Sequence, residues 1–288
     1  VQSDGIDSLE LLPKINWHQN MTSHWTIGEK GAQGKLGAFL AHGLNDYKEG
    51  RNFPAKNNVS QLSPYLHFGE ISPHQVWYAA DIQGKEQRLE KDLGHFHSEL
   101  GWREFSNSLL YHFPSLPTEP FQEKFADFPW TEDDASLEKW RKGETGYPIV
   151  DAAMRELWET GYMHNRCRMV VGSFLVKNML LHWHEGEKWF WDTLVDADLA
   201  NNSASWQWIA GCGADAAPYF RIFNPVLQSK RFDPDGDYIR KWVPELKDVP
   251  DKHIHEPWEH DIKGYPKPIL DHGESRDRAL AAYEKIKG

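Results

Sequence analysis

The sequence predicts an all-α fold. Apolar side chains recur at intervals of three and four residues through most of the chain, and this spacing places them on one face of a helix. Alternation with a period of two, which marks strands, is almost absent, and neither a βαβ rhythm nor an internal repeat is found. The 288 residues suffice for one large domain or two small ones, and a charged fraction of 26% argues against disorder.

We expect residues 1–30 to form a linker and residues 31–288 to form the folded domain. In the first stretch, short apolar segments are interrupted by Pro13 and Gly28. No regular spacing of apolar residues lasts longer than one helical turn. From Leu36 to Tyr47 the apolar residues adopt helical spacing. The folded domain is therefore expected to begin close to this helix.

The remaining predicted helices each carry an apolar face. They are expected at residues 93–113, 148–161, 164–183, 190–195 and 276–286. Pro114 stops the first of these, and Pro148 begins the second, because the first N–H of a helix has no partner within it. Gly186 is expected to mark the end of the third. From about Phe232 to the final helix the chain is Pro-rich and is expected to form loops.

The composition excludes several classes of protein. The longest apolar stretch, near 169–181, contains Lys177 and is shorter than the roughly 20 residues that span a bilayer, so an integral membrane protein is excluded. Two cysteines without a CxxC motif provide neither a disulfide framework nor a zinc site. No metal site is expected, because the two histidines of each His-x-His pair point to different helix faces. With no secretion leader found, we expect a protein of the cytoplasm.

Two bulk properties point in different directions. The net charge of −11 argues against nonspecific DNA binding, although a local basic groove could still attract phosphate. The candidate groove residues are Arg51, Arg103, Arg166, Arg221, Lys230 and Arg231. The aromatic fraction of 13% fits either bulky core packing or rings that stack on a base or cofactor or carry an electron, and composition leaves both open.

One glycine-rich stretch, residues 28–36, is similar to a phosphate-binding loop but does not meet its pattern. The pattern GxxxxGK[ST] requires a glycine and a hydroxyl residue where this chain has Glu29 and Leu36. No strand precedes the stretch either. We therefore reject a phosphate-binding loop at this place.

Residues 99–105 combine a carboxylate, an indole and a guanidinium within about one helical turn. Trp102 beside Arg103 is typical of a pair that stacks on a base and holds a phosphate. Glu99 and Arg103 are four residues apart, so a simple ion pair along the helix is the alternative.

Residues 163–169 carry two arginines, Arg166 and Arg168, that point apart on a helix. One of them can therefore face a polyanion while the other reaches an internal carboxylate. Asn165 and Met169 share a face that could hold a flat heterocycle. A helix start with surface arginines is the alternative for this segment taken by itself.

Residues 196–208 gather two carboxylates, two amides and two indoles among small side chains. Small residues permit the close approach of a ligand to the backbone. Asp196 and Asp198 could bind ribose hydroxyls or a metal, and the metal is disfavoured because no nearby histidines complete a site.

At these segments the chain resembles the DNA photolyase/cryptochrome family, specifically the flavin-binding helical domain of class I cyclobutane pyrimidine dimer photolyases. The matching strings are LSPYLHFGEISP at 62–73, WREF at 102–105, TGYPIVDAAMR at 145–155, MHNR at 163–166, the 196–208 segment and DAAPYFRIFNP at 215–225. The similarity extends over nearly the whole chain from about residue 36, and the motifs together are highly specific.

The resemblance implies an all-α domain with FAD buried inside it, active in the reduced anionic form. After absorbing light, the reduced flavin would pass an electron to a pyrimidine dimer extruded from DNA, and the dimer would split. The chain would then be a carbon–carbon lyase of the deoxyribodipyrimidine photolyase type. A cryptochrome-type blue-light receptor without repair activity is the alternative. A helical DNA-binding module without photochemistry, and repair of the 6-4 photoproduct, rank lower.

The resemblance also has implications for partners. The family's N-terminal α/β antenna domain is absent from the residues given, so no antenna chromophore is expected on them, and the first 30 residues would be an interdomain linker. The expected partners are DNA containing pyrimidine dimers and the missing antenna domain. We expect a monomer without membrane contact, in a bacterial cytoplasm and at the nucleoid when bound to DNA.

Residue roles follow from the resemblance position by position. The implied FAD-binding residues are Tyr47, Val59, Ser60, Gln61, Leu62, Ser63, Phe96, Arg168, Asp196, Ala197, Asp198 and Asn202. The implied residues that meet DNA or the dimer are Arg51, Glu99, Trp102, Arg103, Asn165, Arg166, Met169, Trp208, Arg221 and Gln228. Glu99 would hydrogen-bond a dimer base, and Asn202 would face flavin N5. Trp206, Trp183 and Trp130 would form the electron-transfer chain that photoreduces oxidised FAD.

Two positions depart from the family pattern. The family's phosphate loop usually has Thr-Ser-Arg-Leu-Ser, and this chain has Val59-Ser60-Gln61-Leu62-Ser63, so a hydroxyl and a cation are lost. Phosphate binding is then either weaker or completed by other groups. Phe96 stands where some relatives have a Trp at the flavin edge.

Overall fold

The computed structural model describes residues 5–215, 220–260 and 262–287. Within these ranges the regular structure is helical, and the β contact is an isolated bridge between Thr131 and Leu181. The helices in chain order are η1 (Ile6–Leu9), α1 (Gln19–Ser23), α2 (Glu29–Ala38), η2 (Phe39–Gly43), α3 (Tyr47–Gly50), α4 (Ser63–His67), α5 (Pro73–Glu86), α6 (Glu90–His112), η3 (Glu123–Asp127), α7 (Asp134–Lys142), α8 (Pro148–Thr160), α9 (Asn165–Ser173), η4 (Phe174–Asn178), α10 (Trp183–Thr193), α11 (Leu199–Ala210), α12 (Pro225–Phe232), α13 (Asp237–Trp242), η5 (Pro244–Leu246), α14 (Asp251–Ile254), η6 (Pro257–His260) and α15 (His272–Glu284). The predicted all-α fold is thus confirmed.

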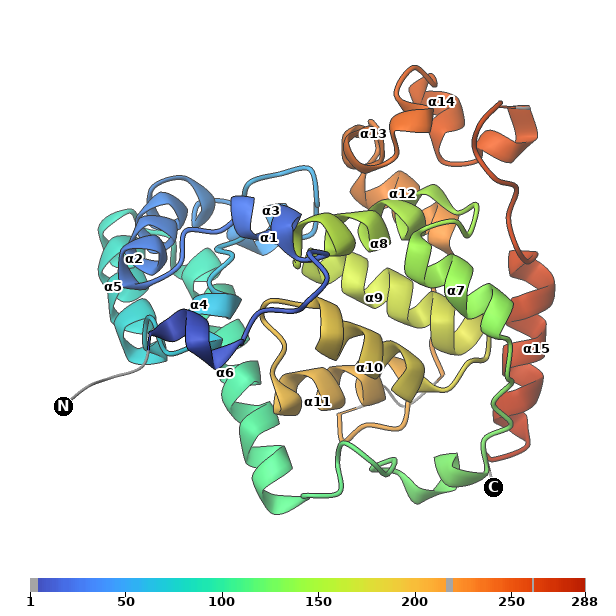
Figure 1. Cartoon of the computed structure of the whole chain (residues 1–288), viewed down its shortest axis with the longest axis horizontal. Helices are drawn as coiled ribbons and strands as arrows, with labels where there is room; N and C mark the ends of the chain where they lie inside the picture. Colours follow the sequence, from blue (N-terminus) through green and yellow to red (C-terminus); the bar gives the residue numbers. More distant parts are fainter. Residues whose placement is uncertain (1–4, 216–219, 261, 288) are drawn as a thin grey trace.

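Two hydrophobic cores organise these helices. The smaller core joins α2, α5 and the first half of α6 through side chains such as Leu36, Val76 and Phe96. The larger core joins α7 to α11 with α13 and α15, around fully buried side chains such as Leu157. Figure 1 shows the first group on the left and the second in the centre and on the right, with the long helix α6 between them.

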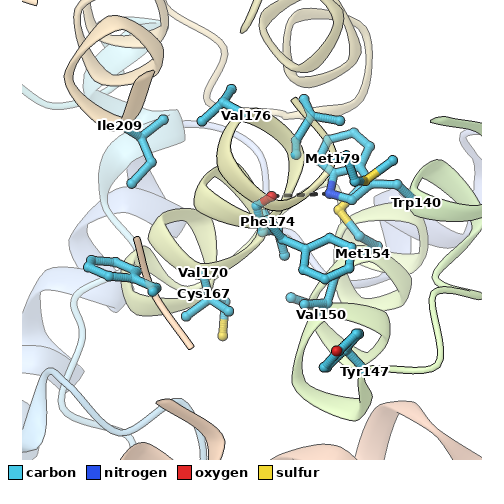
Figure 2. Close-up of a cluster of buried hydrophobic side chains, with 14 of the residues drawn as sticks. Trp140, Tyr147, Val150, Met154, Cys167, Val170, Phe174, Val176, Met179 and Ile209 are labelled. Carbon is cyan, nitrogen blue, oxygen red and sulfur yellow. Dashed lines mark hydrogen bonds between the residues drawn. The ribbon is translucent and has the colours of Figure 1, made fainter. Parts of the chain in front are cut away.

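The centre of the larger core lies between α8, α9 and the π-helical turn η4. Trp140 of α7 is completely buried, and its indole N–H donates to the carbonyl oxygen of Val171 at 3.1 Å. Figure 2 shows this hydrogen bond, with Met154 and Phe174 packed nearby. Burying an indole is favourable when its single donor finds an acceptor, so Trp140 fixes α7 against α9.

Two of the long predicted helices are confirmed. Prediction and structure agree for 93–113, which α6 covers, and for 148–161, which α8 covers. Pro148 occupies the first position of α8, and Gly161 ends it in the left-handed region at φ 68°. The Cβ of any other residue at Gly161 would also lie 2.5 Å from Val195.

The predicted helix at 164–183 is confirmed as far as Asn178 and wrong beyond it. The helical backbone ends with η4 at Asn178, Leu180 has a positive φ of 57°, and Trp183 begins the separate helix α10. Gly186 therefore lies inside a helix instead of ending one, and the short helix predicted at 190–195 is the second half of α10.

Three further segments differ from the pattern. The predicted helix at 36–47 is divided into α2, the π-helical turn η2 and α3. The stretch from Phe232 to the last helix contains the short helices α13 and α14 as well as loops, and the last helix, α15, spans 272–284 instead of 276–286. In the family string 215–225, residues 216–219 lie outside the described residues.

The first 30 residues include the short helices η1 and α1 and the start of α2. Leu11, Leu12 and Ile15 are exposed, whereas Met21 of α1 is buried against α8. The division at residues 30 and 31 stays a prediction. In the part of the chain that the structure describes, no helix combines the length and apolar composition needed to cross a bilayer.

Lys177 of η4 is a buried amine in the larger core. Its Nζ lies 3.5 Å from the ring centroid of Phe220 and 3.4 Å from the carbonyl oxygen of Arg221. Burial lowers the pKa of Lys177 to about 7. The unfolded chain keeps this proton to higher pH, so folding becomes more favourable as pH rises above the folded-state pKa.

We expect the free energy of unfolding of the wild type to rise relative to that of Lys177→Met by about 2 kcal/mol between pH 7 and pH 9. Denaturant titration at both pH values measures the difference. The exposed Lys139 of α7 provides the control, because Lys139→Met should track the wild type. Equal pH dependence in wild type and Lys177→Met would contradict the assignment.

Candidate active site

A cavity of about 650 Å³ lies between the two hydrophobic cores. Leu62, Val76 and Phe96 line it from the smaller core, and Met163 and Trp206 line it from the larger one. Its volume is typical of a pocket for a small molecule or cofactor. The loop at 59–62, the segment 194–198 and helices α6, α9 and α11 supply most of the remaining wall.

The first polar wall is the loop that precedes α4. All five residues from Val59 to Ser63 line the cavity. Gln61 has a φ of 52°, an unusual left-handed conformation for a residue with a side chain. Leu62 is buried, and its backbone N–H lies 3.4 Å from the hydroxyl of Ser60. The loop therefore turns sharply at Gln61 and presents hydroxyls and an amide beside the cavity.

The second polar wall is the segment before α11. Arg168 of α9 donates from Nη2 to Asp196 at 2.8 Å, so the internal carboxylate expected for Arg168 is Asp196. Asp198 is the N-cap of α11 and accepts from the backbone N–H of Asn201 at 2.8 Å. The Oδ1 atom of Asp196 is buried and has no hydrogen-bond partner among the described residues. A ligand hydroxyl is the group that such an atom would accept from.

Asn202 lies one turn into α11 and is oriented by α10. Its Nδ2 donates to the backbone carbonyl of Glu187 at 2.9 Å, and the neighbouring Ser203 donates to the Glu187 carboxylate at 2.5 Å. Asn202 lines the cavity, and none of the described hydrogen bonds uses its Oδ1. Asn202 therefore offers the cavity an acceptor oxygen.

Exposed aromatic side chains mark the mouth of the cavity. Trp102 of α6 and Trp208 of α11 line it and are 50% and 36% exposed. Asn165 and Met169 of α9 line it too, as expected from their shared helix face. Two indoles and a polar amide at an opening suit a flat, partly polar guest.

Glu99 also lines the cavity, and its ion pair differs from the one that helical spacing suggests. The carboxylate accepts from Arg51, the C-cap residue of α3, whereas Arg103 pairs with the adjacent Glu104. Arg51 also lies over the ring of Tyr47, at 5.3 Å from its centroid. Arg51 and Glu99 thereby join α3 to α6 beside the cavity.

The structure brings most of the sequence-predicted residues to this one cavity. Those that line it are Tyr47, Arg51, Val59, Ser60, Gln61, Leu62, Ser63, Phe96, Glu99, Trp102, Arg103, Asn165, Arg168, Met169, Asp196, Ala197, Asp198, Asn202, Trp206 and Trp208. Their individual roles stay predictions.

Five of the residues to which the resemblance gives a role are not among the cavity lining. Trp183 is buried at the start of α10, and Trp130 packs on Phe128 with 4.3 Å between ring centroids. The ring contacts described for Trp206 are with Phe190 and Trp140.

The other three are polar. Arg166 donates to Asn52 and lies 4.2 Å from the ring centroid of Phe232. Arg221 is exposed in the loop before α12, and Gln228 is half-buried in α12. These residues lie on the α9 and α12 side of the molecule, outside the cavity itself.

Several lining residues escaped the sequence analysis. Ser106 and Leu109 lie on the same face of α6 as Glu99 and Trp102, so helical spacing could have identified them. Asn201 lines the cavity and donates from Nδ2 to Asp198 at 2.6 Å. Tyr162 carries no such signal, because it lies in the turn between α8 and α9.

Charges near the cavity are balanced by partners or suppressed by burial. Burial, with Arg166, Arg51 and Arg168 nearby, lowers the pKa of His164 to about 3. The imidazole is therefore neutral at physiological pH, and its Nδ1 accepts from the backbone N–H of Arg166 at 3.2 Å. Among the described residues no group of three or more His, Cys, Asp or Glu side chains is arranged to hold a metal ion.

Comparison with known proteins agrees with this architecture. A deoxyribodipyrimidine photo-lyase of Agrobacterium fabrum is 50% identical over 99% of this chain and 62% of its own length. The crystal structure of a bacterial class III photolyase from Agrobacterium tumefaciens superposes with a TM-score of 0.94 and 50% identity, over 100% of this chain and 62% of that one. A cryptochrome of Synechocystis gives a TM-score of 0.87 and 34% identity, over 95% of this chain and 59% of that one.

The chain thus spans about three-fifths of the length of these relatives. The model of the FAD binding domain of DNA photolyase matches residues 96–285, which include most of α6, all of α7 to α11 and both the Asp196 and Asn202 positions. The chain belongs to the family of the FAD-binding domain of DNA photolyases.

Proposed function

We propose that this chain forms the catalytic domain of an enzyme that repairs cyclobutane pyrimidine dimers in DNA with light absorbed by FAD. The observation that carries the proposal is the cavity itself. Its inner walls offer polar groups suited to a dinucleotide, and two exposed indoles, Trp102 and Trp208, flank its mouth. Relatives that are named deoxyribodipyrimidine photo-lyase support the same reaction.

The residues present fit FAD. The unpartnered Oδ1 of Asp196 is an acceptor for a ribityl or ribose hydroxyl, and the loop from Val59 to Ser63 provides hydroxyls and an amide for the diphosphate. Tyr47 and Phe96 supply apolar wall, and their rings meet edge to face at 5.4 Å between centroids. When bound, FAD would supply the light absorption and the electron.

Asn202 favours the reduced form of the flavin. Because its Nδ2 is held by the carbonyl of Glu187, the atom left for the ligand is the acceptor Oδ1. Reduced flavin carries a proton on N5, and an acceptor at that place stabilises it relative to the oxidised ring, which has none there. We propose the reduced flavin on this ground, whereas its anionic form stays a prediction from the family resemblance, because N5 carries a proton in both the neutral and the anionic reduced flavin.

The mouth is suited to an extruded dimer. Trp102 and Trp208 would hold the two bases, Asn165 and Met169 would line the pocket, and Glu99 would accept or share a hydrogen bond at a base edge. A damaged step stacks poorly, so extruding it costs less than extruding an intact step, which favours damaged DNA. For Trp206, Trp183 and Trp130 we propose the photoreducing electron chain.

DNA is the proposed partner despite the net charge of −11. Arg166 lies on α9, Arg221 in the loop before α12 and Arg231 on α12, and all three would meet backbone phosphates. Arg51 and Arg103 already have carboxylate partners, so we assign them a smaller share of phosphate binding. The protein is proposed to act as a monomer in the cytoplasm, at the nucleoid when bound to DNA.

The class I assignment stays a prediction, and the class III description of the Agrobacterium tumefaciens structure offers the competing subclass. The same holds for the expected absence of an antenna pigment from these residues. An archaeal photolyase from Sulfolobus tokodaii, 38% identical to this chain, is described with two FAD molecules and with the implication of a novel light-harvesting cofactor.

The purified chain should absorb as a flavoprotein and remove thymine dimers from DNA under blue light. Glu99→Ala should lower the repair rate by about tenfold, the loss of one charged hydrogen bond, while keeping its FAD content. Glu99→Gln retains the side-chain length and controls for the loss of the Arg51 contact. Flavin absorption and chromatographic counting of dimers measure the two quantities.

Three other outcomes are informative. Equal losses of FAD and repair in Glu99→Ala would assign Glu99 a folding role. A flavin-containing chain without dimer loss would favour the receptor function found among cryptochromes. A colourless protein would overturn the proposal.

A further inference from the structure

The arginines that line the cavity all have partners of their own. Arg168 pairs with Asp196, Arg51 with Glu99 and Arg103 with Glu104. None of these pairs involves the loop from Val59 to Ser63, and this loop itself contains no charged residue. A bound diphosphate would carry two negative charges at a wall whose own residues supply no cation.

Lys35 of α2 stands behind this wall. Its Nζ donates to Oε1 of Gln61 at 2.5 Å, although the two residues are 26 positions apart. The amine also lies over the ring of Trp25, at 5.5 Å from its centroid. Trp25 in turn donates to the carbonyl of Thr160 at 2.8 Å, so the amine is held between a fixed indole and the loop.

No carboxylate neutralises Lys35 in the described part of the chain, where its hydrogen bond runs to the amide of Gln61 alone. Lys35 is half-buried, and burial lowers its pKa below the ordinary value. A cation that is partly removed from water and has no anion nearby is destabilised until an anion arrives. The arrangement thus favours an anionic guest on the cavity side of Gln61.

The hydrogen bond from Lys35 sets the orientation of the Gln61 side-chain amide. Because Oε1 accepts from Lys35, the amide is turned so that its Nε2 donor group is the end left for another partner, and Gln61 lines the cavity. The left-handed backbone at Gln61, with a φ of 52°, fixes the direction from which the side chain leaves the loop.

We propose that Lys35 supplies the positive charge for the diphosphate of the bound flavin dinucleotide and acts through Gln61, whose amide it orients. Lys35 is thus a positioning residue from the stretch 28–36, which fails the phosphate-binding loop pattern yet contributes its lysine to a phosphate wall. The inference rests on the proposed function only in requiring FAD in this cavity.

The test measures flavin affinity instead of repair. Purified flavin-bound protein is diluted serially, and the recovery of flavin fluorescence gives the dissociation constant of FAD. Lys35→Met should weaken binding about tenfold, and Lys35→Arg should keep most of the affinity. Lys30→Met, an exposed lysine on the same helix, is the matched control and should equal the wild type.

Two further measurements separate charge from packing. The wild-type dissociation constant should rise more steeply with sodium chloride than that of Lys35→Met, because salt screens an ionic contact. Gln61→Gly keeps the left-handed backbone and removes the amide, and its effect should not add to that of Lys35→Met.

The outcomes distinguish this inference from the function. Wild-type affinity in Lys35→Met, or equal losses in Lys35→Met and Lys35→Arg, would overturn the role of Lys35 while FAD binding stands. Additive effects of Lys35→Met and Gln61→Gly would overturn the action through Gln61. Absence of FAD from the wild type would overturn the proposed function and this inference with it.

Discussion

Arg168→Met should destabilise the fold by about 3–5 kcal/mol and remove FAD from the purified protein. The guanidinium donates to Asp196 at 2.8 Å and to the carbonyl of Met163 at 2.8 Å. The Asp196 side chain is only 3% exposed, so without Arg168 a carboxylate would stay buried with no cation. Burying an unpaired charge is among the most costly changes a core can suffer.

Denaturant titration and flavin absorption measure the two effects. Arg276→Met removes an exposed ion pair with Asp277 and should change stability by less than about 1 kcal/mol. The double variant Arg168→Met/Asp196→Leu should recover much of the lost stability, because the buried charge is gone, yet it should not recover FAD. If Arg168→Met were as stable as the wild type, the pair would not hold the second wall together.

Gly186→Ala should cost about 3 kcal/mol or more, although alanine is the better helix former. Gly186 lies in the first turn of α10, and an added Cβ would lie 2.0 Å from Cη2 of Trp206 of α11. Trp206 is 3% exposed and packs on Phe190 at 5.0 Å between ring centroids, so the indole has little room to yield. Because Trp206 lines the cavity, the displacement should also lower FAD retention.

Gly94→Ala is the matched control for this change. Gly94 also lies inside a helix, α6, but nothing lies within 4 Å of an added Cβ. Alanine should therefore stabilise the protein there by about 0.5–1 kcal/mol through its helix propensity. Thermal unfolding of both variants decides the question, since a stabilised Gly186→Ala would mean that α10 and α11 separate easily.

Local sequence signals predicted the helices that begin and end for local reasons. Pro148 and Gly161 bound α8 as expected, because a missing N–H and a left-handed backbone are properties of single residues. The break after η4 has a different cause. Thr131 donates its backbone N–H to Leu180 at 2.8 Å and its hydroxyl to Met179 at 3.0 Å, so a distant segment ends the helix.

Gly186 is a second position at which a contact from another helix overrides the local sequence signal. A glycine in a helical pattern indicates an end, but here its missing side chain makes room for Trp206 from another helix. In the cavity, side chains on one helix face were predictable from their spacing. The partners of Glu99 and Gln61 were not, because Arg51 and Lys35 reach them from helices far away in the sequence.

The two polar walls differ in how freely they can change. Asp198 faces the cavity and also starts α11, the helix that carries Asn202, Trp206 and Trp208. A substitution of Asp198 that suits a different ligand would remove the N-cap and destabilise the start of α11, and with it the three side chains that this helix presents to the cavity. In the loop at 59–63, Leu62 and Ser63 also begin a helix, α4, whereas Val59 and Ser60 begin none. Natural drift and laboratory evolution toward altered cofactor preference should therefore accumulate at Val59 and Ser60 and spare the aspartates.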